Sequence, residues 1–224
     1  MANLILIVGD TGTGKSTSIN TLPPTETVLI NCAKKPLPFK GSSSSYISGK
    51  NRFDYDDADK IVGLLKSIQD TPAVKNVVID DSGFVMSEYF FDQLDETGYA
   101  KFTRLAKRYQ SILSTCKSLR NDLNVAVMLH DDDKMSNGII ISKKAKTIGK
   151  LVDDQYNPLS VVSVALFTDV EFDKDGNPTY YFITRMCKKN GVTIPAKSPS
   201  GMFETTRIPN DLATVFKISQ SYYN

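Results

Sequence analysis

The sequence predicts an α/β protein built on a mostly parallel sheet, flanked by helices and extended near the C-terminus by an antiparallel β-hairpin. Three observations lead to this prediction. Short apolar segments alternate with amphipathic helical segments along most of the chain, an order typical of parallel sheets. The apolar segment 4–8 runs directly into a glycine-rich loop. Later, two apolar runs flank Asp175-Gly176, which is a strong hairpin signal.

The composition is that of one ordinary globular domain. The 224 residues suit a single domain over residues 1–224, with a core over about 1–170 and a hairpin and tail over about 171–224. No apolar run approaches the ~20 residues that span a bilayer, and the N-terminus lacks the features of a signal peptide. We therefore expect a cytoplasmic protein with no membrane contact.

Charge and cysteine content narrow the possible partners. The net charge is only +2, so any contact with nucleic acid must come from a local basic patch. The three cysteines are scattered, without the C-x-x-C spacing of a zinc site. They indicate reduced packing residues of a cytosolic protein.

Residues 9–16 read GDTGTGKS and match the phosphate-binding pattern G-x-x-x-x-G-K-[ST] without a gap. Glycines let the backbone curl so that several N–H groups point at a phosphate, and the helix N-terminus behind them adds partial positive charge. The Lys15 ammonium is expected to reach the β- and γ-phosphates, and the Ser16 hydroxyl to ligate Mg²⁺. The predicted nucleotide-binding residues are Gly9, Asp10, Thr11, Gly12, Thr13, Gly14, Lys15, Ser16 and Thr17.

The first half of the chain continues with alternating helices and strands. Pro23-Pro24 ends the helix that starts at Thr17, because proline cannot continue it. A long polar segment, 33–55, is expected to be a functional or mobile loop. The expected strands are 27–31 and 74–79, and a helix is expected over 56–69, where apolar residues recur at helical spacing.

The second half contains the longest amphipathic pattern, which predicts a helix over 99–119. A strand over 123–129 is followed by a polar segment, 131–150, that we expect to be a loop. Strands over 160–172 and 179–186 form the predicted hairpin, and a last helix is expected over about 209–218 with proline at its start.

Asp80 and Asp81 follow the buried strand that ends at Ile79. In parallel sheets, ligands bind outside the carboxyl ends of the strands. We expect Asp80 to hold Mg²⁺ directly or through water, and Asp81 to orient or deprotonate an attacking water. Paired acids at a strand end can also simply cap the next helix, which is the alternative for both residues.

His130 is the only histidine and ends the apolar strand 123–129. If that strand lies between the strands that carry the glycine-rich loop and Asp80, its tip faces the γ-phosphate. His130 would then sense the phosphate and signal to the segment beyond. The alternative is a histidine with one ordinary hydrogen bond.

Together these motifs resemble the core of RecA-like P-loop ATPases. More specific segments are similar to small phage-encoded nucleotide-binding proteins of the Sak-type single-strand-annealing group, and the resemblance covers nearly the whole chain. These segments are 30–31 with 35–41, 146–151, 196–199 and 208–212. The resemblance implies a RecA-like fold, ATP and Mg²⁺ as ligands, and catalytic roles for Lys15, Asp81 and His130. It also implies hydrolysis gated by single-stranded DNA, in phage recombination or replication within the infected bacterial host, beside a single-strand-binding protein.

One departure from the family concerns catalysis. Many RecA-like ATPases carry a glutamate just after the second strand, but residues 31–35 contain no carboxylate. Hydrolysis is therefore expected to be slow, to use Asp81, or to need a neighbouring copy in a homo-oligomer with ATP at the subunit interface. Candidate cations supplied by a neighbour are Lys143, Lys144, Lys150, Arg185, Lys188 and Lys189.

Single-stranded DNA is expected to bind the loop 131–150, whose lysines can pair with phosphates, although Asp131-Asp132-Asp133 would repel them. Two other functions remain open. A small-molecule kinase is disfavoured because only six arginines occur and none clusters. A nucleotide-gated binding module with little hydrolysis fits the missing glutamate. A GTPase is disfavoured because no N-K-x-D pattern occurs.

Overall fold

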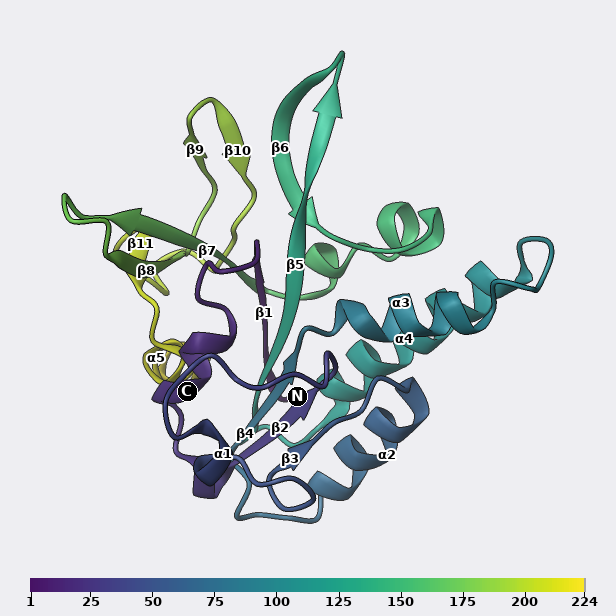
Figure 1. Cartoon of the computed structure of the whole chain (residues 1–224). Helices are drawn as coiled ribbons and strands as arrows, with labels where there is room; N and C mark the ends of the chain where they lie inside the picture. Colours follow the sequence, from purple (N-terminus) through teal and green to yellow (C-terminus); the bar gives the residue numbers. More distant parts are fainter. Residues whose placement is uncertain (224) are drawn as a thin grey trace.

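The structure, a computed structural model, describes residues 1–223 and is centred on one large sheet. The strands of this sheet are β1 (Asn3–Gly9), β2 (Thr27–Asn31), β3 (Arg52–Phe53), β4 (Asn76–Asp80), β5 (Asn124–Ser136), β7 (Val164–Phe172), β8 (Pro178–Ile183) and β11 (Arg207–Pro209). Their order is β11-β8-β7-β1-β5-β4-β2-β3, and the pairs from β7 to β3 are all parallel (Figure 1). The strands β8 and β11 extend the β7 edge in antiparallel pairing. The predicted α/β class and the antiparallel hairpin are confirmed.

Helices cover both faces of this sheet (Figure 1). One face packs against α2 (Ala58–Ile68), α3 (Gly83–Asp92) and α4 (Ala100–Ser118). The other packs against α5 (Leu212–Tyr223) and the short 3₁₀ helix η1 (Ser16–Thr21). Within residues 1–223, none of the helices combines the length and apolar character that a bilayer span requires.

The apolar run of β1 is explained by these two covered faces. Leu4, Leu6 and Val8 pack into the core beneath α2 to α4, while Ile5 and Ile7 pack into the core beneath α5. Successive side chains of a strand point to opposite faces, so a strand buried on both faces must be apolar throughout.

The segment 131–150 is not a loop, as the sequence analysis expected. The strand β5 continues beyond the main sheet to Ser136 and pairs with β6 (Ile139–Ala145) in an antiparallel hairpin. Asn137-Gly138 makes the turn, with positive φ at both residues (50° and 76°). A second hairpin, β9 (Cys187–Lys189) and β10 (Val192–Ile194), lies beside β6, and both project from the sheet in Figure 1.

Several other predicted boundaries were wrong. The polar segment 33–55 contains the short helix α1 (Ser42–Ser45) and the strand β3. The helix α3 was not predicted. The last helix starts at Leu212 because Pro209 belongs to β11, and the residues after the glycine-rich loop form 3₁₀ rather than α-helix. The remaining short helices are η2 (Pro24–Glu26), the π-helical turn η3 (Leu151–Gln155) and η4 (Pro158–Val161).

A row of asparagines joins three strands where the parallel strands begin. Asn3 Nδ2 donates to Asn124 Oδ1 at 3.0 Å, and Asn124 Nδ2 donates to Asn76 Oδ1 at 3.0 Å. Ser219 Oγ of α5 donates to Asn3 Oδ1 at 2.6 Å. These bonds fix the register of β1, β5 and β4 and attach the last helix to the sheet.

Replacing Asn124 with alanine would leave Asn3 Nδ2 and Asn76 Oδ1 without their hydrogen-bond partner. We expect the free energy of unfolding to fall by about 2 kcal/mol, because buried polar groups that lose a hydrogen bond cost about 1–3 kcal/mol. Urea unfolding of Asn124→Ala measures this change, with Asn121→Ala on the exposed neighbouring turn as the control. Equal stability of the two variants would contradict a role for the asparagine row.

Candidate functional site

The predicted site residues meet at the carboxyl ends of the parallel strands. Gly9 at the end of β1 pairs with His130 of β5, and Asn31 at the end of β2 pairs with Asp80 of β4. The strand β5 lies between β1 and β4. This is the strand order on which the expectation that His130 faces a γ-phosphate depends.

Two glycines of the loop have steric reasons to be glycine. A Cβ at Gly9 would overlap the Thr168 side chain of β7, whose hydroxyl lies 2.6 Å from that of Thr13. Gly14 has φ of +95°, and a Cβ there would lie 2.9 Å from the ring of Tyr180. The loop is therefore packed closely against β7 and β8.

Lys15 is almost completely buried beneath this loop. Its Nζ donates to the carbonyl oxygens of Gly9 at 2.7 Å and Asp10 at 2.8 Å, and lies 3.4 Å from His130 Nδ1. Burial lowers the pKa of Lys15, and the nearby carboxylates of Asp81 and Asp80 oppose this shift. The ammonium is therefore fixed by two carbonyl oxygens of the loop.

Ser16 and Asp80 form the contact between the loop and β4. Ser16 Oγ donates to Asp80 Oδ1 at 2.9 Å, while Asp80 Oδ2 is buried and has no hydrogen-bond partner. Burial, and secondly the charge of Asp81, raise the pKa of Asp80 to about 6. A buried carboxylate oxygen without a partner is costly, so it marks a position that suits a cation.

Ser16 and Asp80 offer two oxygen ligands. This number suits Mg²⁺, which also binds waters and phosphates, better than a metal ion that is bound by protein side chains alone. Magnesium keeps several waters and binds through one or two protein oxygens together with substrate phosphates. Within residues 1–223, no group of three or more His, Cys, Asp or Glu side chains is arranged to hold a metal ion. Ser16 and Asp80 would therefore supply the protein's share of such a site.

Asp81 is buried between two basic side chains. His130 Nε2 lies 3.3 Å from Asp81 Oδ1, and the Lys35 ammonium forms an ion pair with Asp81 Oδ2. Burial alone would raise the pKa of Asp81, but the hydrogen bond from His130 and the ion pair with Lys35 outweigh it and lower this pKa to about 2. Asp81 has φ of +51°, a conformation that non-glycine residues rarely adopt.

The hydrogen-bond partners of His130 assign its ring proton. The Lys15 ammonium can only donate, so His130 Nδ1 accepts from it, and Nε2 carries the proton that is donated to Asp81. His130 thus links the lysine of the loop to the acid that follows β4.

These residues surround a pocket of about 380 Å³. Its lining residues are Thr11, Gly12, Gly14, Lys15, Ser16, Thr17, Lys35, Pro36, Pro38, Asp81, His130 and Tyr180. Of the predicted loop residues, Gly9, Asp10 and Thr13 lie behind the pocket, where they hold Lys15 or contact Thr168. Asp80 lies beneath it, bonded to Ser16.

Lys35, Thr168 and Tyr180 were not predicted as site residues. Lys35 follows the carboxyl end of β2, and this position at a strand end was the available signal for it. Thr168 and Tyr180 belong to the hairpin β7–β8, and no local pattern indicates that this hairpin packs against the loop.

Most of the lysine and arginine side chains that were candidates for acting on a neighbouring subunit's site have partners within their own chain. Lys143 pairs with Asp131 and Asp133 across the hairpin β5–β6, and Lys144 pairs with Asp153. Lys189 pairs with Asp169, and Arg185 donates to the carbonyls of Phe203 and Glu204. In the described chain, no ion pair is recorded for Lys150 or Lys188, and none of the six candidates lines the pocket.

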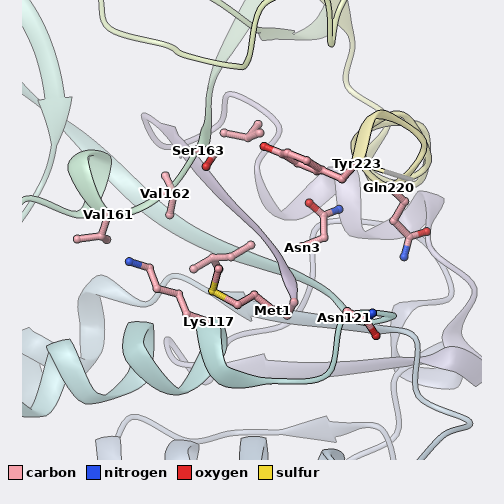
Figure 2. Close-up of a pocket in the computed structure, with 12 residues that line it drawn as sticks. Met1, Asn3, Lys117, Asn121, Val161, Val162, Ser163, Gln220 and Tyr223 are labelled. Atoms are coloured by element: carbon pink, nitrogen blue, oxygen red, sulfur yellow. The ribbon is translucent and has the colours of Figure 1, made fainter.

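A second pocket, of about 540 Å³, lies at the opposite ends of the parallel strands, where β1 begins (Figure 2). It is bordered by Lys117 of α4, by Asn121 of the turn that follows, by Gln220 and Tyr223 of α5, and by Val162. None of the predicted site residues lines it.

Comparison with known proteins adds no further constraint to this geometry. No model of a known protein family matches the sequence, and a search of characterised proteins gives no significant match.

Proposed function

We propose that the protein binds and hydrolyses ATP with Mg²⁺ and has a RecA-like core. The carrying observation is that Lys15, Ser16, Asp81 and His130 line one pocket, with Asp80 bonded to Ser16. A curled glycine loop, a buried ammonium and a buried acid together suit a triphosphate and its metal.

Each residue has a role that follows from its chemistry. The N–H groups of the loop and the Lys15 ammonium would bind phosphate oxygens, and Ser16 with Asp80 would hold Mg²⁺. The metal, when bound, would neutralise phosphate charge. Asp81 would orient the attacking water, since its lowered pKa makes it a weak base. His130 would report the presence of the terminal phosphate.

We further propose that single-stranded DNA stimulates hydrolysis and that the protein works as a homo-oligomer in phage recombination or replication, beside a single-strand-binding protein. One structural observation favours a coupling between the nucleotide site and DNA binding. The strand β5 runs without a break from His130 into the hairpin β5–β6. Lys134, Lys146 and Lys150 are exposed on or near this hairpin, where they could reach DNA phosphates.

A nucleotide-gated binding module with little hydrolysis is the second candidate. It is favoured by the ion pair that occupies Asp81, because an acid paired with Lys35 cannot orient water. Tight ATP binding with turnover near background, in the presence or absence of DNA, would favour this alternative.

We expect Lys15→Ala to weaken ATP binding by at least about 100-fold, because about 2.7 kcal/mol is a reasonable loss for charge-assisted bonds to phosphate. Titration calorimetry measures the affinity, and circular dichroism checks that the fold survives. Lys174→Ala, in the exposed turn of the hairpin β7–β8, is the control. Unchanged ATP affinity in Lys15→Ala would contradict the assignment of the site.

Asp80→Asn is expected to weaken Mg²⁺-dependent ATP binding while stabilising the nucleotide-free protein. The folded-state pKa of about 6 exceeds the usual value of 3.8, so above pH 6 the buried charge opposes folding. Removing it should add on the order of 1 kcal/mol, or about 2–4 °C in Tm for a chain of this size. Asp175→Asn, in an exposed turn, is the control for calorimetry and thermal unfolding. Unchanged dependence of ATP affinity on Mg²⁺ would exclude the metal role.

His130→Ala is expected to retain ATP affinity within about twofold, since its ring lies beside the lysine and the acid rather than in the loop itself. Stimulation of turnover by single-stranded DNA should be lost. Steady-state turnover with and without an oligonucleotide at low salt measures both effects. Equal stimulation in the variant and the native protein would show that His130 does not transmit the signal, and no stimulation of the native protein would contradict the DNA proposal.

A further inference from the structure

We infer that Lys35 is a second phosphate-binding cation of the site, which exchanges its ion pair with Asp81 for the γ-phosphate when a nucleoside triphosphate binds. This inference rests on the proposed nucleotide site and names a residue and an exchange that the glycine-loop motif does not contain. It rests on where Lys35 lies, how its backbone is held and what its partner must do.

The position of Lys35 places its charge in the phosphate pocket. Its ammonium pairs with Asp81 Oδ2, and its side chain lines the same pocket as Lys15 and Ser16. Lys15 and Lys35 are the two lysine side chains among the lining residues, and the described chain places no arginine there. A site that receives a triphosphate therefore offers one buried and one exposed ammonium.

The two lysines differ in freedom of movement. Lys15 is 5% exposed and is fixed by two carbonyl oxygens, whereas the Lys35 side chain is 49% exposed and pairs with a single carboxylate. A half-exposed lysine on a flexible four-carbon stem can change partners, and such a move leaves Asp81 paired with His130. Lys35 can thus reorient toward an incoming anion while Lys15 stays in place.

The backbone of Lys35 is fixed by its neighbours, whereas its side chain is held only by the ion pair with Asp81. Asn31, buried at the end of β2, donates through Nδ2 to the Lys35 carbonyl oxygen at 2.9 Å. Lys34 adopts φ of +54° and forms an ion pair with Asp56 on the outside of the turn. Pro36 follows directly and restricts the chain further. The turn thus directs Lys35 into the pocket and Lys34 away from it.

The exchange would release the acid that the proposed reaction needs. Both oxygens of Asp81 have partners, one in His130 and one in Lys35. When Lys35 moves to the γ-phosphate, Asp81 Oδ2 becomes available to a water. The Lys35 charge then acts in cis in the role that the sequence analysis gave to a neighbouring subunit, which is to neutralise charge on the transferred phosphoryl group.

The reaction step remains balanced. The oxygen of the water bonds to the γ-phosphorus as the bond from phosphorus to the bridging oxygen breaks, and that oxygen leaves on ADP with the electron pair. One proton of the water stays on inorganic phosphate and the other passes to solvent. Lys35 and Asp81 are unchanged at the end, and departure of the phosphate lets their ion pair re-form.

The test compares ATP with ADP in matched variants. Lys35→Met removes the charge and keeps the length of the side chain, and Lys34→Met makes the same change at the neighbouring residue that pairs with Asp56. We expect Lys35→Met to weaken Mg²⁺-ATP binding about tenfold and ADP binding by less than about twofold, because only ATP carries the γ-phosphate. Lys34→Met should change neither affinity, and Lys35→Arg should restore most of the ATP preference.

Calorimetry with both nucleotides, together with turnover, decides between the possible outcomes. Equal losses for ATP and ADP, or no loss, would overturn the inference. If Lys35 has a purely structural role, Lys35→Met loses stability because Asp81 is unpaired, and adding Asp81→Asn to this variant restores the preference for ATP. The inference predicts instead that the double variant still fails to prefer ATP. If Lys15→Ala loses both nucleotides while Lys35→Met behaves as the native protein, the proposed function stands and the inference is wrong. If the native protein binds neither nucleotide, both are wrong.

Discussion

The hydrogen bond from Ser16 Oγ to Asp80 Oδ1 is the contact on which the candidate site depends. It joins segments 64 residues apart in the sequence and places the glycine-rich loop against the end of β4. The cost of this arrangement is a buried carboxylate with one oxygen unpartnered. Proteins tolerate such groups mainly where they serve a function, because an unpaired buried oxygen lowers stability. The two apolar cores on opposite faces of the sheet stabilise the fold and offset the destabilising effect of this buried oxygen.

The acidic and basic side chains of the site come from different strands and loops, and their charges offset one another. Asp80 ends β4 and Asp81 follows it, Lys15 comes from the loop after β1, and Lys35 comes from the turn after β2. The two acids have opposite pKa shifts because Asp80 is buried with a hydroxyl donor, whereas Asp81 is buried against two basic groups. Neighbouring carboxyl groups with pKa values driven apart often take different tasks in one reaction. Here this division favours Asp80 as a ligand and Asp81 as the acid that contacts water.

The sequence predicted those parts of the fold and site that local patterns encode. The glycine loop after β1, the acids at the end of β4 and the histidine of β5 each belong to a continuous segment, and the parallel strands bring these segments together. The sequence analysis predicts a loop where the hairpin β5–β6 forms, because many residues around Asn137-Gly138 are charged, although this pair is a typical two-residue turn. Thr168 and Tyr180 reach the site only through tertiary packing, which no spacing of residues in the chain reveals, whereas the place of Lys35 after a strand end was a weak local signal.

The unbroken path of β5 limits how it can move. Its first half is paired with β1 on one side and β4 on the other, and Val125, Val127 and Leu129 all point into the same core. Sliding the strand by one residue would turn these side chains toward the opposite face, which the packing forbids. Any movement of the hairpin β5–β6 relative to the sheet would therefore be a tilt or twist rather than a slide of β5, and the register irregularity between Lys134 and Met135 is a place where the strand can bend.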